Sequence, residues 1–263
     1  MRSLDSSFLI CEAFIMNVKT ARRTLDLFEA FAEVKAPLTL SDLSRHLEWP
    51  ISSSFALVRT LETRGFLYSV SQRRGFYPTR RMLDRTTIIA EHDPIAEQTG
   101  AVLSHLRYAT GETVLLGRLQ VGQVVYLNIF EPQQSIRYSA KPGDVKPLHS
   151  SAMGKALLAG LADEDRDALL STVELRKVTP FTITSRARLV AHLDEGSRRG
   201  WQMTRSENVS DVMAIAKSVW LAGEQYGIAI AGPVHRMDVD VDRHVKALQE
   251  ACGQLELSHG DQS

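Results

Sequence analysis

Three side chains in the second half of the chain, Asp144, His149 and Ser151, have the residue types of a hydrolase triad. In such a triad the histidine takes the proton of the serine hydroxyl while the carboxylate orients the imidazole ring. The sequence lacks the G-x-S-x-G turn that presents the nucleophile in α/β-hydrolases. We therefore expect His149 to be a hydrogen-bonded structural residue, and predict neither a catalytic residue nor a metal ligand.

The stretch AMGKA, residues 152–156, resembles the end of a phosphate-binding loop. The motif G-x-x-x-x-G-K requires a glycine five residues before Gly154, where His149 stands instead. ATP binding is therefore not expected, and no cofactor is predicted. Lys217 lies in an otherwise apolar stretch, and we interpret it either as a charge that protects an edge strand or as an anchor for an anion.

Charged residues are distributed unevenly along the chain, although the formal net charge is zero. Residues 1–85 contain 13 Lys and Arg against 9 Asp and Glu, whereas the rest of the chain contains 18 against 22. A basic first part and an acidic second part are typical of a DNA-binding module joined to a domain of another kind.

The segment WPISSSFALVRTLE, residues 49–62, has the periodicity of an amphipathic helix. One face carries Ser54, Leu57, Val58 and Leu61, the opposite face carries Ser52, Ala56, Arg59 and Thr63, and the flanks carry Ser53, Phe55 and Thr60. Small hydroxylated residues at the start of a helix let the backbone approach DNA, where hydroxyls and free amides can bind phosphates.

The neighbouring segments predict the domain that would position this helix. Residues 20–33 have helical spacing, and a second, short helix follows Thr39, which forms a capping box with Asp42. That helix ends at Trp49-Pro50, and Gly65 ends the third helix. Residues 66–80 alternate on both sides of a basic turn, as in a β-hairpin. Three helices and a hairpin predict a winged helix-turn-helix over residues 1–80.

Several residues of this domain are predicted to contact DNA. Arg59 is the candidate for reading a base, and Phe55 is either a contact to a thymine methyl group or part of the core. The arginines at the tip of the wing are predicted to contact phosphate or the minor groove. The full predicted set is Thr39, Ser52, Ser53, Phe55, Arg59, Arg73 and Arg74.

The rest of the chain predicts a linker and an α+β domain. Residues 81–110 have helical character with Pro94 as a start or kink, and predict one or two linker helices. In residues 111–263 we expect a hairpin over 113–130, an extended segment at 135–140, a loop at 141–149, helices at 150–160, 163–172 and 186–199, strands at 211–220 and 226–232, and a helix at 239–257. Hairpins with inserted helices are typical of sensor-like α+β domains.

The two cysteines, Cys11 and Cys252, lack metal-ligand spacing and predict no disulfide framework. The apolar runs Phe8–Cys11 and Ala13–Met16 are interrupted by Glu12 and are too short to cross a membrane. We expect a cytoplasmic protein with no membrane partner.

From about Thr20 to Leu257 the chain resembles the IclR family of bacterial transcription regulators. The stretches that carry the resemblance are LTLSDLSRHLEWPISSSFALVRTLETRGFL, GFYPTRRML, KPGDVKPLHSSAMGKALLA, RRGWQM and YGIAIAGP. The resemblance implies an N-terminal winged helix-turn-helix, a linker helix, and a GAF-like antiparallel-sheet domain that binds an effector. It also implies homodimers or homotetramers bound to operator DNA.

The chain departs from the pattern of this family at both sites. Ile51 and Ala56 stand where the family usually has a basic residue and an arginine, which leaves Arg59 for base contacts. The resemblance implies that relatives that bind small acids use the backbone amides at the positions of Ala152 and Met153 and a carboxylate near Thr204–Arg205. It also implies that they have a cysteine where this chain has Ala214, and serines where it has Ala229 and Ala231. The predicted effector site is Ser151, Ala152, Met153, Thr204, Ala214, Ala229 and Ala231.

Because alanine replaces polar residues at these positions, the predicted pocket is less polar than that of the relatives. A less polar pocket favours an aromatic or cyclic carboxylate over a two- or three-carbon keto acid. The function that we predict is a ligand-responsive, DNA-binding regulator that is not an enzyme and that controls a catabolic operon. Two alternatives stay open at this point. One is a small-molecule-binding enzyme with a winged helix used for protein contacts, and the other is a sensor domain that has lost its ligand and serves for oligomerisation.

Overall fold

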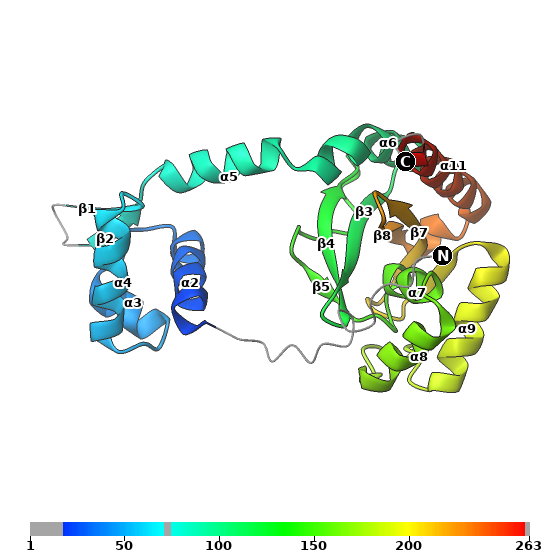
Figure 1. Cartoon of the computed structure of the whole chain (residues 1–263), viewed down its shortest axis with the longest axis horizontal. Coiled ribbons are helices and arrows are strands. Elements are labelled where there is room, and N and C mark those ends of the chain that lie inside the picture. Colours follow the sequence, from blue (N-terminus) through cyan, green and yellow to red (C-terminus); the bar gives the residue numbers. More distant parts are fainter. Residues whose placement is uncertain (1–17, 71–74, 261–263) are drawn as a thin grey trace. The chain divides into compact units, whose positions relative to one another are not determined.

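The computed structural model describes residues 18–70 and 75–260 (Figure 1). The chain divides into two compact units between Asp93 and Pro94. Among the described residues, none of the helices is long and apolar enough to cross a membrane.

Within the described residues, the first unit begins with three helices and a two-stranded antiparallel hairpin, as the sequence predicts, and ends with the helix α5 (Arg81–Glu91) described below. The helices are α2 (Lys19–Val34), α3 (Leu40–His46) and α4 (Ile51–Thr63), and the strands are β1 (Leu67–Val70) and β2 (Gly75–Pro78). Their apolar faces form one core that includes Leu27, Phe31, Leu43, Val58 and Leu67. Residues 71–74, which join the two strands, lie outside the described part of the chain.

The boundaries of α3 and α4 follow from local hydrogen bonds. Thr39 caps α3, since its hydroxyl accepts from the Asp42 amide at 3.1 Å while the Asp42 carboxylate accepts from the Thr39 amide at 3.1 Å. The predicted capping box is therefore confirmed. Pro50 precedes the first turn of α4, and its carbonyl accepts from the amides of Ser53 and Ser54.

Two helices follow the hairpin, α5 (Arg81–Glu91) and α6 (Pro94–Thr110). Helix α5 has no buried residue, whereas Leu103 and Leu106 of α6 belong to the core of the second unit. The boundary between the two units therefore falls inside the predicted linker of residues 81–110, with α6 packed on the second unit.

The second unit is built on a six-stranded antiparallel sheet in the order β5-β4-β3-β8-β7-β6. The strands are β3 (Thr113–Gln120), β4 (Gln123–Phe130), β5 (Val145–Lys146), β6 (Gln202–Arg205), β7 (Val212–Leu221) and β8 (Glu224–Pro233). The helices are α7 (Ala152–Ala159), α8 (Asp163–Thr172), α9 (Arg186–Arg199), α10 (Val234–Met237) and α11 (Val241–Gly260).

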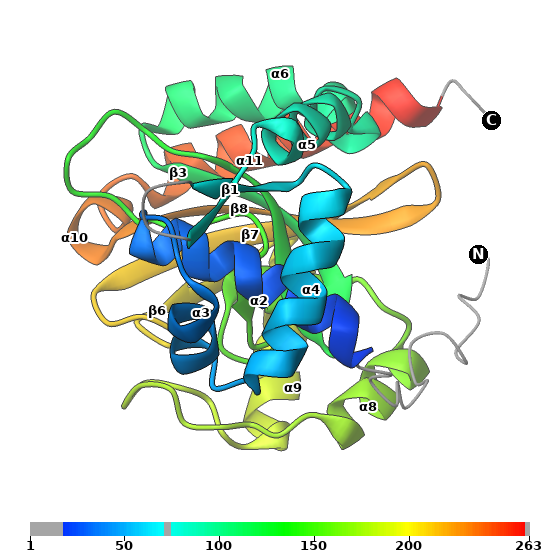
Figure 2. The same ribbon diagram turned by 90° about the vertical axis from the view of Figure 1, so that its left-hand side faces the viewer.

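Helices cover both faces of this sheet, and each face has its own core. Figure 2 shows α6 and α11 on one side of the sheet and α8 and α9 on the other. Alternate residues of β8 point to opposite faces, so Ile228 and Ile230 pack in the core with α6 and α11. Ala229 and Ala231 pack in the core with α7. On the α7 face, strand β8 thus contributes small residues.

Two parts of the sheet differ from the sequence expectation. Residues 135–140, expected to be extended, lie in no strand, and the two-residue strand β5 lies instead in the expected loop 141–149. Strand β6 was not predicted. Strands β5 and β6 are too short to show an alternation of apolar and polar residues in the sequence. They are strands because they pair with β4 and β7.

Candidate functional site

The start of α7 presents unpaired backbone amides. Ser151 caps the helix, since its hydroxyl accepts from the Gly154 amide at 3.1 Å and donates to the Pro147 carbonyl at 2.7 Å. Within the described chain, the amides of Ala152 and Met153 have no hydrogen-bond partner. Free amides at the positive end of a helix dipole form a site for an anion.

The glycine of AMGKA has a packing role in this helix start. A Cβ atom at Gly154 would overlap the backbone of Leu148. The preceding residue, Met153, packs closely on the sheet, where a Cβ atom at Gly227 would overlap its side chain. Glycine at these two positions therefore lets α7 lie close to the loop before it and to the sheet.

A small cavity lies between the start of α7 and the sheet. Its volume is about 30 Å³, room for about two water molecules. All seven residues predicted for the effector site line it, together with six others. The lining is Ser151, Ala152, Met153, Thr204, Ala214, Ala229 and Ala231, with Leu115, Tyr126, Tyr138, Asn208, Val209 and Val212.

The strand register explains why distant predicted residues meet in this cavity. Thr204 of β6 pairs with Ala214 of β7, and Ala214 pairs in turn with Ala231 of β8. These three residues form one row across the sheet, with side chains on the α7 face. The row gives the cavity a floor made of small side chains.

Polar groups in the cavity wall are uncharged. The hydroxyls of Tyr126 and Tyr138 interact with each other. Burial is the main reason why the pKa of Tyr126 is raised above its ordinary value, and the contact with Tyr138 raises it further. Thr204 and Asn208 supply a hydroxyl and an amide. None of the residues that line the cavity is acidic or basic. An anion there would find the α7 amides and would meet no opposing carboxylate.

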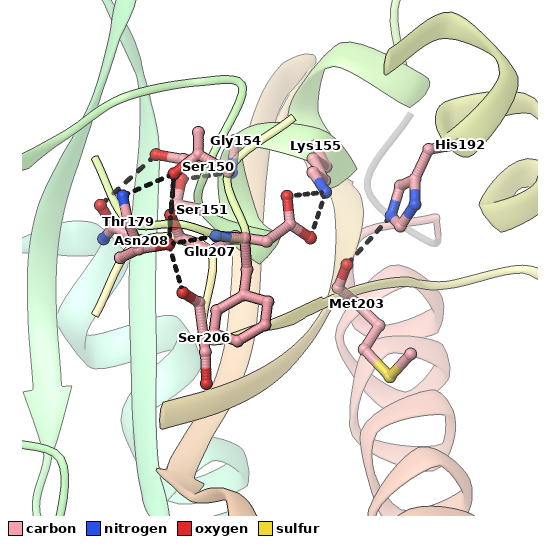
Figure 3. Close-up of polar contacts among 12 residues, drawn as sticks. Ser150, Ser151, Gly154, Lys155, Thr179, His192, Met203, Ser206, Glu207 and Asn208 are labelled. Atoms are coloured by element: carbon pink, nitrogen blue, oxygen red, sulfur yellow. Dashed lines mark hydrogen bonds and ion pairs between the residues drawn. The ribbon is translucent and has the colours of Figure 1, made fainter. Parts of the chain in front are cut away.

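The carboxylate nearest Thr204–Arg205 on the C-terminal side, Glu207, is engaged elsewhere. Its two oxygens accept from the Lys155 ammonium at 2.7 and 2.8 Å, with both side chains almost fully buried (Figure 3). Burial raises the pKa of Glu207 and lowers that of Lys155, and the charge of each partner opposes this shift. Sequence reasoning missed this pair, since 52 positions separate the two residues.

The residues considered for a hydrolase triad do not form one. The Nε2 atom of His149 lies 2.8 Å from the Arg176 carbonyl, and the Ser151 hydroxyl donates to the Pro147 carbonyl. Burial lowers the pKa of His149. Lys217 lies 4.0 Å from Glu256 of α11, on the sheet face away from the cavity, and is not an anion anchor in it.

The exposed side of α4 forms a second candidate site. Ser54, Val58 and Leu61 are buried, whereas Ser52, Phe55, Ala56 and Arg59 are exposed. The predicted division of this helix into two faces is therefore confirmed. Within the described chain the hydroxyls of Ser52 and Ser53 have no partner, and no side chain caps the start of the helix.

The remaining residues of the predicted DNA-binding set differ in their surroundings. The Arg59 side chain is 62% exposed and forms an ion pair with Glu62 at 2.8 Å. Phe55 is 51% exposed and is not part of the core. Thr39 is half-buried, and its hydroxyl is used by the capping box. Arg73 and Arg74 lie outside the described residues.

Sequence reasoning missed six of the cavity residues. Tyr126, Leu115 and Val212 lie on expected strands, and their alternation with core residues is a signal that places them on the α7 face. Tyr138 lies in a loop without such a signal. It is positioned by the Thr113 hydroxyl, which donates to its carbonyl at 2.5 Å.

Both parts of the chain match known family models. A model described as the C-terminal domain of the bacterial transcriptional regulator IclR matches residues 87–257. A model described as the IclR helix-turn-helix domain matches residues 20–71.

The chain is also similar to curated regulators and solved structures. It is 30% identical to the HTH-type transcriptional regulator BhcR of Paracoccus denitrificans, over 92% of this chain and 87% of that protein. It is 26% identical to the HTH-type transcriptional repressor AllR of Escherichia coli, over 77% and 75%.

Among solved structures, IclR of Thermotoga maritima superposes with a TM-score of 0.78 at 21% identity, over 92% of this chain and 99% of that one. An IclR homologue from Microbacterium hydrocarbonoxydans, complexed with 4-hydroxybenzoate, superposes with a TM-score of 0.72 at 21% identity, over 90% and 98%.

Proposed function

The chain belongs to the IclR family of bacterial transcriptional regulators, and we propose that it binds operator DNA through α4 and a carboxylate effector through the start of α7. The observation that carries the effector part is the meeting of all seven predicted residues in one cavity. The relatives are transcriptional regulators, and we propose no catalytic step for this chain.

The effector class that suits the lining of this cavity is an aromatic or cyclic carboxylate. Its carboxylate binds the amides of Ala152 and Met153, and its ring lies over the alanine floor against Leu115 and Val212. An uncharged lining favours an apolar ring over a two- or three-carbon keto acid, which needs polar partners for its remaining oxygens. The complex of the Microbacterium hydrocarbonoxydans homologue with 4-hydroxybenzoate supports this class of ligand.

On the DNA side, the start of α4 lies against the phosphate backbone and Arg59 reads a base. The hydroxyls of Ser52 and Ser53 and the uncapped amides of the first turn bind phosphate oxygens. To reach a guanine, Arg59 exchanges its ion pair with Glu62 for the bidentate contact that arginine makes with O6 and N7.

The protein acts in the cytoplasm as a homodimer or homotetramer on paired half-sites. Helix α5 supports this assembly, since it has no buried residue and exposes Leu83, Ile88 and Ile89. Two winged helices on one face of DNA read half-sites about 34 Å apart. The effector can change the affinity for DNA only by the difference between its own affinities for two arrangements of the paired domains.

The test combines calorimetry with DNA binding. We expect benzoate or 4-hydroxybenzoate to bind stoichiometrically and to change the affinity for the upstream region of the gene of this protein. That affinity should fall steeply as salt is raised. Tight stoichiometric binding of pyruvate or glyoxylate would contradict the ligand class. Binding of none of these acids, with normal operator binding, would favour a sensor domain used only for oligomerisation.

A further inference from the structure

The segment Ser206–Asp211, which connects β6 to β7, forms part of the cavity wall. Asn208 and Val209 of this segment line the cavity. The segment begins and ends with a residue in the left-handed region, Ser206 at φ 57° and Asp211 at φ 60°. Neither is glycine, so contacts elsewhere must hold these conformations.

Those contacts come from three other parts of the same unit (Figure 3). The Thr179 hydroxyl donates to the Ser206 carbonyl at 2.6 Å, and the Thr182 hydroxyl donates to the Glu207 carbonyl at 2.7 Å. The Ser150 hydroxyl donates to the Asn208 side chain at 3.4 Å.

A further attachment, and the one between two charged side chains, is the ion pair of Glu207 with Lys155. It joins the segment to α7, the helix whose first amides face the cavity from the opposite side. The pair is almost fully buried, at 0% and 8% exposure of the two side chains. A buried ion pair is weak evidence of a stabilising role, because apolar residues of similar size would often serve stability as well. Its geometry does tie the segment to α7 at one point, through two bonds of 2.7 and 2.8 Å.

The cavity is too small for the proposed effector unless part of its wall moves. At about 30 Å³ it holds water molecules and not an aromatic ring. The floor consists of paired residues of β7 and β8 in the middle of the sheet, and the opposite side is a helix packed closely on that sheet. Tyr138 also lies outside helices and strands, but segment 206–211 contributes two wall residues and has a non-glycine residue in the left-handed region at each end.

We propose that segment 206–211 is the movable wall of the effector cavity and that the Lys155–Glu207 ion pair is the latch that holds it closed. This inference rests on the proposed function for the role of the cavity. Lys155 and Glu207 are positioning residues, since neither lines the cavity. Entry of an effector requires the segment to swing about Ser206 and Asp211, which breaks the ion pair or pulls it along.

The experiment measures hydrogen exchange of the ligand-free full chain, which does not depend on knowing the effector. The test variant carries Lys155→Met with Glu207→Leu, so that no buried charge is left unpaired. We expect amides 207–212 to exchange about tenfold faster, with peptides from α8 and α11 unchanged. Stopped-flow mixing with benzoate should show faster association.

Two further variants separate the latch from general stability. Arg236→Met with Glu112→Leu removes another ion pair of the same unit, 2.6 Å long, and should leave exchange of 207–212 unchanged. Ser150→Ala removes only the hydroxyl that donates to the Asn208 side chain, and should give a smaller increase in the same peptide even if the double variant does not fold.

The outcomes decide the latch and the proposed function separately. Unchanged exchange of 207–212 in the folded double variant, or an equal increase in every peptide, overturns the latch. Failure of benzoate to bind the unmodified protein contradicts the proposed effector class, while the exchange data still decide whether the segment is latched.

Discussion

Ala214 of β7 lies directly opposite Ala231 of β8, and both side chains line the cavity beside α7. Larger side chains at this pair would fill the space above them, because the start of α7 covers the same part of the sheet. The pair therefore controls both the volume and the polarity of this cavity, the proposed effector site.

Substitution of Ala231 tests this control. Ala231→Leu should abolish benzoate binding and destabilise the fold by about 1–3 kcal/mol, since it overpacks a small, buried site. Ala231→Ser is the matched variant, which adds one hydroxyl with little volume. It should raise the affinity for pyruvate relative to benzoate in calorimetric titrations. Benzoate binding to Ala231→Leu at unchanged affinity would place the ligand elsewhere.

Replacement of Arg59 tests the DNA-reading face of α4. Arg59→Ala should weaken operator binding by about 1–3 kcal/mol, measured by fluorescence anisotropy, and relax the sequence preference at one base pair. Glu62→Ala is the control, since it removes the same ion pair and leaves the arginine in place. Equal losses in both variants would mean that Arg59 acts only through its ion pair.

The wing arginines are expected to behave differently. Arg74→Ala should weaken binding to specific and unrelated DNA alike, and the slope of log K against log salt should become less negative by about 1 if one phosphate contact is lost. A loss confined to the operator sequence would instead make Arg74 a base-reading residue.

The cap of α7 is expected to contribute to stability. Ser151→Ala should lower the free energy of unfolding by about 1 kcal/mol, because the Gly154 amide loses its partner. Ser185 offers a matched control, since it occupies the same position before α9 without a side-chain cap bond. Thermal unfolding of Ser185→Ala should show a much smaller change, and equal effects would argue against the cap.

Stability is expected to fall in mild acid because of buried histidines. Burial lowers the pKa values of His149, His192 and His244 below the ordinary value of 6.5. Below pH 6.5 the unfolded chain therefore binds protons that the folded chain does not, and stability decreases by up to about 1.4 kcal/mol per pH unit for each group. Chemical unfolding of His149→Gln between pH 7 and pH 5 should show a shallower decrease, and an unchanged slope would exclude His149 as a source.

The elements with strong periodicity could be predicted from sequence. The two faces of α4, the hairpin β3–β4 and the helices α7, α8 and α9 lie close to their expected positions. Helices α4 and α9 bury apolar residues at helical spacing, and such periodicity can be recognised in a sequence. The short strands β5 and β6 could not be predicted, since neighbouring strands define them.

The candidate site could be predicted only in part, because some of its residues, like the short strands, depend on contacts with distant segments. Its first residues came from a resemblance over matched positions, and the sheet register explains why those positions meet. The Lys155–Glu207 pair and the position of Tyr138 depend on contacts between segments far apart in the sequence, and no local sequence pattern predicts such contacts.

Alternate residues of strands β7 and β8 have different roles, because they lie on opposite faces of the sheet. Ile215, Ile228 and Ile230 point toward α6 and α11, and they hold the sheet to those helices whatever lies on the other face. A change at Ala214 or Ala231 alters what the cavity accepts without touching that attachment. At the proposed effector site, one or two atoms added to a small side chain would therefore change which ligand is accepted while the packing of the sheet on these helices stays as it was.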